Sequence, residues 1–374
     1  MRKDWEYKKL GEVGIFLRGK NILKSDFVEK GLPCIHYGQI HTKFDISIEN
    51  HLSEISEDVY KKAIIASPGD VVIAITSEDL DGSCKSTVWN GCYDIAVSAH
   101  AAVYKHKLNL NPKYIAYYFR SKSFYIEKGK YARGFKVMEI KTSDIAKIPI
   151  PIPQSHIQEL IVAELDKLNE MIRLKKQQLE DYDQLAQSIF YEMFGDPVEN
   201  EKGWEVKKLG EICTIFAGGD KPNDIKQILD KDYKYPVIAN GDGSKGVLGY
   251  TKNCKVKEDA VTIGARGASI GNCRIVKNGF TPAVRLLTLI PGVFLNCSYL
   301  FYIVKGLDYK QNGAGQAQLT VPNIKIETIP LPPLPLQQQF AARIEAIEQQ
   351  KQQVKDTIKD LETLLASRMQ YWFD

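Results

Sequence analysis

The chain has 374 residues, enough for two ordinary domains, and its hydrophobic content of 44% is normal for a globular protein. Its formal net charge of +4 permits nucleic-acid binding but does not require it. No apolar run approaches the roughly 18 residues of a membrane span, and the N-terminus lacks the hydrophobic segment of a signal peptide. The seven cysteines are scattered without metal-binding spacing. We therefore expect a cytoplasmic protein with reduced thiols, no membrane contact and no metal site.

One segment near the N-terminus occurs a second time in the middle of the chain. Residues 5–13 read WEYKKLGEV and residues 204–212 read WEVKKLGEI, so seven of nine positions are identical. A weaker match follows in the same order, between residues 111–117 and 296–302. Chance is a poor explanation for ordered matches of this kind, so the pattern indicates an internal duplication. With only two large copies, a stacked-repeat architecture is not expected.

Each copy begins with a region that the pattern predicts to be a mixed α/β domain, at residues 1–153 and 197–335. Short apolar runs indicate strands, and aromatic runs behind a capping asparagine, Asn111 or Asn296, indicate helices. The expected elements correspond between the copies: strands at 70–75 and 260–263, and helices at 114–119 and 299–304. The second domain is shorter by a stretch in its middle.

Each domain ends in a proline-rich segment, at residues 148–153 and 329–335, which we expect to be extended because proline disfavours helix in the residue before it. A long heptad-patterned helix is then predicted within residues 154–196 and again within 336–374, each about 60 Å long at 1.5 Å per residue. The apolar positions predicted to pack the two helices together are Leu165, Leu168, Ile172, Leu179, Tyr182, Ile344, Ile347, Val354, Ile358 and Leu361.

Connectivity predicts how these helices pair. A short loop beginning at Gly195 joins the first helix to the second domain, so the domains are expected at opposite ends of the rod. If the heptad stripes pack together, the second helix must run back antiparallel. The alternative is two separate helices, each binding a partner.

Motifs for catalysis are weak. Residues 241–246 match G-x-G-x-x-G but lie between expected strands, which favours a hairpin loop, and no Walker A motif is present. Residues 111–114 (NPKY) only partly match the catalytic loop of amino-methyltransferases. Acidic residues at 70–81 could form a metal site, but the second copy has Asp259 without a matching acidic cluster after it, and the six histidines show no catalytic spacing. We therefore predict no catalytic residue.

The remaining polar candidates are basic and amide side chains on glycine-rich loops of both copies. Arginine and lysine neutralise phosphates, arginine can bind guanine through two hydrogen bonds, and glutamine can do so with adenine. The candidate DNA-binding residues are Arg18, Lys20, Lys43, Arg133, Lys136, Lys221, Lys245, Arg266, Arg274, Gln316 and Gln318.

The ordered duplicate resembles a known family. Each copy carries Trp-x-x-x-x-Leu-Gly-Glu, an α/β region, an Ile-Pro segment followed by glutamines, and a heptad helix, and the second adds the loop at 262–267 (TIGARG). This order is similar to that of the specificity subunit of type I restriction–modification systems, over essentially the whole chain. The first copy departs from it, with residues 75–79 (ITSED) in place of the Ala-Arg-Gly loop.

The resemblance implies a non-catalytic subunit. Each domain would be a target-recognition domain that binds one half of a split, asymmetric site in double-stranded DNA, and the helix pair would set the spacer between the halves. The helices would also dock two methylation subunits and, through them, the restriction and motor subunits. S-adenosylmethionine, ATP and Mg²⁺ would belong to those partners, and no cofactor is expected in this chain. Two alternatives stay open: a single-chain site-specific nuclease or methyltransferase, and a protein-interaction adaptor without a DNA role.

Overall fold

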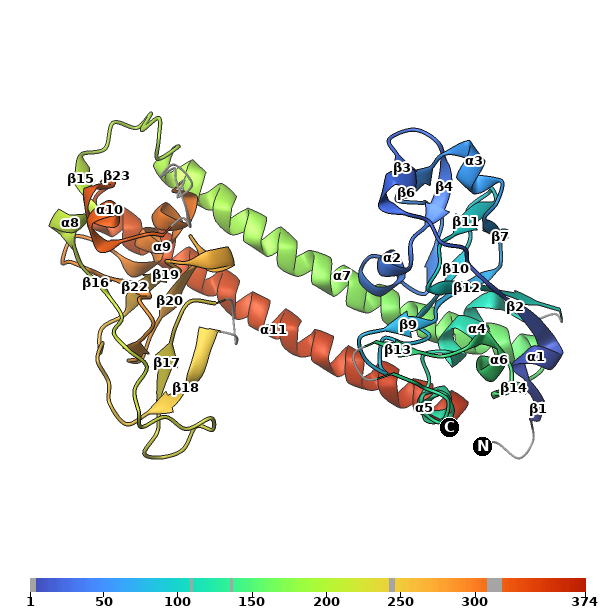
Figure 1. Ribbon diagram of the computed structural model, residues 1–374. Coiled ribbons are helices and arrows are strands. Elements are labelled where there is room, and N and C mark those ends of the chain that lie inside the picture. The colour runs from blue at the N-terminus through green and yellow to red at the C-terminus, as the bar shows by residue number, and fades with distance from the viewer. Residues whose placement is uncertain (1–4, 108–109, 135–136, 242–245, 308–317) are drawn as a thin grey trace. The chain divides into compact units, whose positions relative to one another are not determined.

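The computed structural model describes residues 5–107, 110–134, 137–241, 246–307 and 318–374. The chain divides into two compact units (Figure 1). Unit 1 comprises Met1–Lys175 and Thr357–Asp374, and unit 2 comprises Lys176–Asp356. Each unit therefore contains one α/β region together with a part of both long helices. In the described part of the chain, none of the helices is both long and apolar enough to cross a membrane.

Unit 1 contains two five-stranded sheets. The first has the order β2-β12-β8-β10-β5, with bounds Gly14–Arg18, Ala101–His106, Val71–Ala74, Ser86–Trp89 and Ser47–Ile48. The second has the order β3-β6-β4-β11-β7, with bounds Phe27–Val28, Ser53–Ile55, Leu32–Ile35, Ile95–Val97 and Ile64–Ala66. Unit 1 also has two separate two-stranded sheets, which pair β1 (Glu6–Lys9) with β14 (Pro149–Ile152) and β9 (Thr76–Ser77) with β13 (Met138–Glu139).

Strand β8 is apolar throughout because both of its faces are buried. Val71 and Ile73 belong to the core cluster that also contains helix α4 (Pro112–Tyr118), whereas Val72 and Ala74 belong to a second cluster between the two sheets. Successive side chains of a strand point to opposite faces, so one strand supplies both cores. The other elements of unit 1 are α1 (Leu10–Val13), η1 (Lys24–Asp26), α2 (Tyr37–Thr42), α3 (Glu57–Tyr60), α5 (Lys122–Gly129) and α6 (Thr142–Ile145).

Unit 2 repeats the first sheet of unit 1, which we call the main sheet, and has fewer strands beside it. Its four-stranded sheet has the order β16-β22-β19-β20, with bounds Cys213–Ala217, Leu287–Pro291, Ala260–Ile263 and Cys273–Val276. Its three-stranded sheet has the order β18-β17-β21, with bounds Val247–Thr251, Tyr235–Ile238 and Thr281–Pro282. The other elements are β15 (Val206–Lys208), β23 (Thr328–Pro330), α8 (Leu209–Ile212), η3 (Gly267–Ser269), α9 (Cys297–Gly306) and α10 (Val321–Ile326). The order β18-β17-β21 matches β6-β4-β11 of unit 1, with the same parallel and antiparallel pairings. Among the described residues, β3, β5, β7 and α3 of unit 1 have no counterpart in unit 2, which accounts for part of the predicted length difference.

Both predicted asparagine caps are present. The Asn111 side chain accepts hydrogen bonds from two backbone N–H groups of α4, and Asn296 does the same for α9. The buried Gln158 then accepts from the Asn111 backbone N–H at 2.9 Å and donates to the Pro153 carbonyl at 2.9 Å. Gln337 repeats this in unit 2, accepting from the Asn296 N–H at 2.8 Å and donating to Pro332 at 2.7 Å. These glutamines fasten the start of each long helix to its domain.

The long helices span Ser155–Phe194 (α7) and Leu334–Phe373 (α11). Helix α7 begins directly after the first proline segment, and Gly195, with φ +78°, follows its last residue as a left-handed cap. One boundary prediction was wrong. The second proline segment was expected to be extended through Pro335, but α11 already begins at Leu334, because proline is well tolerated in the first turn of a helix, where its missing N–H has no helical partner.

In unit 1 the two helices pack as antiparallel neighbours (Figure 1). Glu164 of α7 receives two hydrogen bonds from the Arg368 guanidinium and one from the Trp372 indole at 2.8 Å. This hydrogen-bonded Arg368 holds the pKa of the Glu164 carboxyl below its usual value. At the end of α11, the Phe373 ring packs against Tyr114 and Tyr118 of α4, at 5.3 and 5.9 Å between ring centroids.

In unit 2 an aromatic cluster joins the same two helices to the domain. Phe190 of α7 lies 5.7 Å from Phe340 of α11 and within 6 Å of Tyr299 and Tyr302 of α9. Seven residues earlier on α7, Asp183 pairs with Lys351 at 2.7 Å, so residue numbers fall along α11 as they rise along α7. The antiparallel pairing predicted from the heptads is confirmed, and separate partner-binding helices are excluded.

Candidate nucleic-acid interface

The two units share a tight turn at the end of their main sheet. In unit 1 the Gly19 N–H donates to Ala101 and the Ala99 N–H donates to Lys20. In unit 2 the Gly218 N–H donates to Leu286 and the Val284 N–H to Gly219, which is the same pattern. The strand registers agree with this equivalence: Ala102 pairs with Arg18, and Leu287 pairs with Ala217. The turns 98–101 and 283–286 are therefore equivalent.

A second shared feature lies at the end of the central strand. In unit 1, Thr76 pairs with Glu139, and the Ile140 N–H donates to the Ile75 carbonyl at 3.1 Å. In unit 2, Arg266 pairs with Gln318, and the Leu319 N–H donates to Ala265 at 3.0 Å. Residues 75–77 therefore occupy the position of the Ala-Arg-Gly loop. The first copy departs from the family pattern in sequence and not in backbone position.

The turn and the strand end are linked in both units. The Ile75 N–H donates to the His100 carbonyl at 2.9 Å, whereas in unit 2 the Asn240 side chain accepts from the Ala265 N–H and donates to Val284, both at 2.7 Å. We call these surfaces edge 1 and edge 2. Edge 1 consists of residues 18–20, 37, 75–77, 98–101 and 139, and edge 2 of residues 217–219, 240, 265–267, 283–286 and 318.

Three of the predicted cationic residues of unit 1 gather on or beside edge 1. The Arg18 guanidinium forms an ion pair with Glu139 at 2.9 Å, and Arg133 forms both backbone hydrogen bonds of a β-bridge with the same glutamate. Lys20 is exposed on the turn side of the edge. The fourth, Lys43, is exposed at the C-terminal end of α2.

Edge 2 brings together a different set. The Arg266 guanidinium donates to the Gln318 side chain at 3.1 Å, and both residues are exposed. Arg274, on the neighbouring strand β20, is half-buried and donates to the Gly241 carbonyl. Lys221 is exposed two residues beyond the end of the edge. The predicted residues Lys136, Lys245 and Gln316, and most of the G-x-G-x-x-G segment at 241–246, lie outside the described residues.

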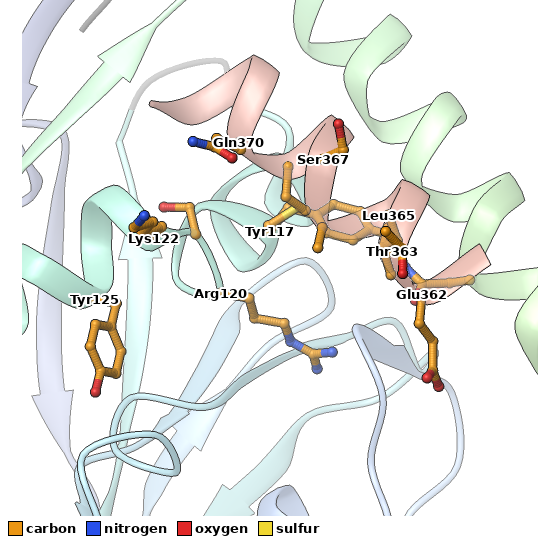
Figure 2. A pocket seen from close by; sticks show the side chains of 13 residues that line it. Tyr117, Arg120, Lys122, Tyr125, Glu362, Thr363, Leu365, Ser367 and Gln370 are labelled. Carbon is orange, nitrogen blue, oxygen red and sulfur yellow. The ribbon is translucent and has the colours of Figure 1, made fainter. Parts of the chain in front are cut away.

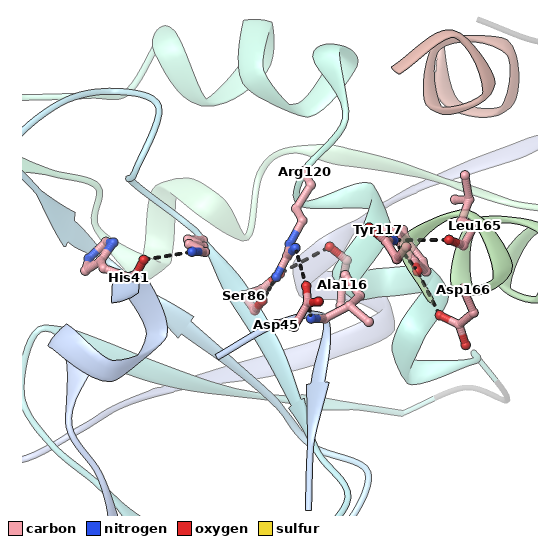
Figure 3. Close-up of polar contacts among 11 residues, drawn as sticks. His41, Asp45, Ser86, Ala116, Tyr117, Arg120, Leu165 and Asp166 are labelled. Atoms are coloured by element: carbon pink, nitrogen blue, oxygen red, sulfur yellow. Dashed lines mark hydrogen bonds and ion pairs between the residues drawn. The ribbon is translucent and has the colours of Figure 1, made fainter. Parts of the chain in front are cut away.

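Helix α2 is held against edge 1 by partly buried polar contacts (Figure 3). The His41 ring lies 3.1 Å from the Thr76 carbonyl, and the Lys85 ammonium donates to the His41 carbonyl at 2.8 Å. Burial lowers the pKa of Lys85, and the nearby Arg120 lowers it further. Arg120 itself binds Asp45 at 3.2 Å and the Ser86 carbonyl at 3.0 Å. The edge is thus built on a fixed polar support.

Figure 3 also shows how α4 is fixed to α7. The Tyr117 hydroxyl donates to Asp166 at 2.7 Å and accepts from Asn169 at 2.9 Å, while the Lys113 ammonium donates to the second oxygen of Asp166 at 2.7 Å. Burial, followed by the hydrogen bond to Asp166, raises the pKa of Tyr117. These contacts tie α4, and with it the α/β region of unit 1, to the first part of α7.

Unit 1 also contains a cleft of about 690 Å³ between the α4–α5 junction and the last turns of α11 (Figure 2). Its charged side chains include Arg120, Lys122 and Glu362, and Arg120 is already bound to Asp45 and Ser86. The lining residues offer no nucleophile with an adjacent base. In the described part of the chain, no group of three histidine, cysteine or acidic side chains could hold a metal ion. The two edges are therefore the better candidate sites.

The arrangement offers hydrogen-bond donors and acceptors on rigid turns rather than a reactive centre. Arginine, glutamine and glutamate side chains at such turns match the donor and acceptor pattern of base edges. Sequence reasoning missed His100, Arg285, Tyr37 and Asn240. An alignment of the two turns could have found His100 and Arg285, but the sequences SAHA and AVRL share too little for that. Tyr37 and Asn240 lie outside both turns and join the edges only through the fold.

The ten predicted helix-packing residues all lie on inward-facing positions. Eight are at least 92% buried, and Leu179 and Tyr182 are half-buried. Leu165 packs mainly into the core of unit 1, and Ile344 and Ile347 into that of unit 2. These positions therefore join helix to domain as well as helix to helix.

Comparisons with known proteins agree with this geometry. Residues 2–181 and 201–363 match the family described as type I restriction modification DNA specificity domain. A Mycoplasma pneumoniae protein that carries the name of a type I specificity subunit is 30% identical over 263 residues, covering 64% of this chain and 73% of that protein. The specificity subunit of the MjaIX type I restriction enzyme from Methanocaldococcus jannaschii is 25% identical over 395 residues, covering 92% and 87%.

A solved structure from work on complex assembly and conformational transition of the type I restriction–modification system has the same fold, with a TM-score of 0.61, 19% identity and coverage of 99% and 97%. The family consists of DNA specificity components, so the expectation of a non-catalytic recognition chain is confirmed at the level of the family. Two matched halves, two matched edges and the family match over both halves lead to one conclusion: the chain belongs to the type I restriction modification DNA specificity family.

Proposed function

We propose that edge 1 and edge 2 each bind one half of a bipartite, asymmetric target in double-stranded DNA. The observation that carries this proposal is the duplicated edge, with the same turn, strand end and backbone hydrogen bonds but different side chains. Thr76 and Glu139 stand where the second copy has Arg266 and Gln318. Shared backbone with divergent side chains is what two recognition sites for different sequences require.

The exposed cations beside the edges would supply the phosphate contacts. Lys20 and Lys43 in unit 1 and Lys221 in unit 2 are exposed and can bind the DNA backbone without regard to sequence. Arg266 and Gln318 then remain for base edges, where arginine suits guanine and glutamine suits adenine. Binding should accordingly weaken steeply as salt is added.

The helix pair would act as the spacer between the half-sites. Interlocked aromatic packing in unit 2 and the Glu164–Arg368 contact in unit 1 support a stiff connection at each domain. Two half-sites on one face of the duplex are separated by about one helical turn, roughly 35 Å, or by a multiple of it. A pair of 40-residue helices has sufficient length for this role.

The same helices would dock two methylation subunits and, through them, the restriction and motor subunits of a cytoplasmic complex. We place S-adenosylmethionine, ATP and Mg²⁺ on those partners and none of them on this chain. The support is the family membership together with the exposed surface of the helices, which includes Met171, Leu174 and Leu185 on α7.

A selection from random duplex DNA tests the proposal. The chain, alone and together with a methylation subunit of its system, is incubated with a library of fully random 40-base-pair duplexes, and the bound molecules are sequenced. Two short motifs separated by a gap of fixed length are expected. Enrichment of one continuous motif, or of none, would refute the bipartite proposal.

A further inference from the structure

Each edge contains a non-glycine residue in the left-handed backbone region. His100 has φ +68° in the turn 98–101, and in the turn 283–286 Val284 and Arg285 have φ +51° and +58°. The strand registers place His100 and Arg285 at equivalent positions, each two residues before the paired residues Ala102 and Leu287. Glycine adopts this conformation without cost, whereas a residue with a Cβ is strained there. Both copies thus carry a long polar side chain at a position that glycine would suit better.

Each turn packs closely against a neighbouring glycine and accepts a hydrogen bond through its backbone. A Cβ on Gly19 would lie 2.1 Å from the Ser98 carbonyl oxygen, and one on Gly218 would lie 2.6 Å from the Pro282 carbonyl carbon. At each turn, the backbone of the glycine and the backbone at the start of the turn are therefore too close to leave room for a side chain. The His100 carbonyl accepts from Ile75 at 2.9 Å, and the Val284 carbonyl accepts from Asn240 at 2.7 Å. Strain maintained by such contacts marks functional sites, and the held backbone fixes the direction of the Cα–Cβ bond at residues 100 and 285.

Both side chains are exposed on the edge. The His100 ring makes a tilted contact with Tyr37, at 5.2 Å between ring centroids, and interacts electrostatically with His36. In the described part of the chain, the exposed Arg285 guanidinium has neither a hydrogen-bond partner nor an ion-pair partner. Other arginines of the edges are engaged, Arg18 with Glu139 and Arg266 with Gln318. On edge 2, Arg285 is therefore an arginine whose five donors are available to a ligand.

We propose that His100 and Arg285 are specificity-determining residues, each reading one base pair in its own half-site. The inference rests on the proposed bipartite DNA recognition. A guanidinium that projects from this turn can donate two hydrogen bonds to O6 and N7 of guanine. A neutral imidazole offers one donor and one acceptor, so His100 should distinguish bases less sharply than Arg285. We expect Arg285 to select guanine by about 5- to 150-fold over the other bases at one position.

Substitution by glycine separates recognition from folding. Arg285→Gly and His100→Gly remove the side chain at a backbone conformation that glycine prefers, so the thermal midpoint should stay constant or rise. Lys231→Ala removes one exposed cation of unit 2 away from edge 2 and serves as the charge control. All three variants and the unchanged chain, each with a methylation subunit, enter the same selection from random duplexes.

The expected result is the loss of preference at one base pair of one half-site with Arg285→Gly, and at one base pair of the other half-site with His100→Gly. Lys231→Ala should leave every base preference unchanged. If the unchanged chain selects a bipartite motif and both glycine variants select the same motif with the same preferences, the inference is refuted while the proposed function stands. If the unchanged chain selects no bipartite motif, both fail.

Discussion

Gln337 fastens α11 to unit 2, and its replacement by alanine should destabilise that unit measurably. The side chain is fully buried and makes three hydrogen bonds, from the Asn296 N–H at 2.8 Å and to the carbonyls of Pro332 and Phe294 at 2.7 and 3.1 Å. Gln337→Ala leaves three backbone groups without these partners. An unsatisfied buried group costs about 1–3 kcal/mol, and entry of water into the space offsets part of the sum. We expect a loss of about 3 kcal/mol in the free energy of unfolding of unit 2.

For a unit of this size, a loss of that magnitude lowers the melting temperature by roughly 6–12 °C. Calorimetry measures this shift, and hydrogen exchange across residues 294–300 shows whether the opening begins at the N-terminal end of α9. The neighbouring Gln338 is exposed, so Gln338→Ala is the matched control and should change stability by less than about 0.5 kcal/mol. If Gln337→Ala melts at the same temperature as Gln338→Ala, the hydrogen bonds do not fasten the helix as described.

Three further predictions concern the spacer, the turn and pH. Deleting residues 175–181 together with 351–357 removes one heptad from each helix and shortens the helix pair by about 10 Å. The gap in the selected DNA should then shorten by up to about 3 base pairs, while both half-site sequences stay the same. Loss of either half-site would contradict the spacer role. Gly218→Ala places a Cβ against the backbone at the start of the turn 283–286 of edge 2. Affinity for the second half-site should therefore fall in a gel-shift titration, while affinity for the first stays unchanged. Hydrogen bonding to Arg368 lowers the folded-state pKa of Glu164, so this pair stabilises unit 1 at neutral pH. The stabilisation is lost as pH falls through that lowered pKa. In Glu164→Gln, the free energy of unfolding should therefore fall less steeply at acid pH, and an unchanged dependence on acid pH would argue against the pair.

The duplication, the helices and their antiparallel pairing could be predicted because each depends on local patterns. Heptads fix the buried stripe of α7 and α11, and Asn111 and Asn296 are visible caps. The start of α11 was misplaced because Pro335 can either end an extended segment or stand in the first turn of a helix, and the residue type alone does not decide between the two.

The edges were only partly predictable. Arg266 and Gln318 were identified from residue type, but their pairing joins positions 52 residues apart. The equivalence of His100 and Arg285 rests on strand register and positive φ, which carry no sequence signature in SAHA and AVRL. Arg18 was also identified from residue type, but its ion pair with Glu139 could not be predicted, because Glu139 is brought near by the pairing of β13 with β9.

Exchange of one recognition domain tests the central claim most directly. Residues 204–329 are replaced by the corresponding segment of another family member whose selected motif is known, and the chimera is put through selection from random duplexes. Two independent recognition domains on a common helix pair predict a hybrid motif, in which one half changes to that of the donor while the other half and the gap stay the same. A motif in which both halves change, or in which neither does, would contradict the account.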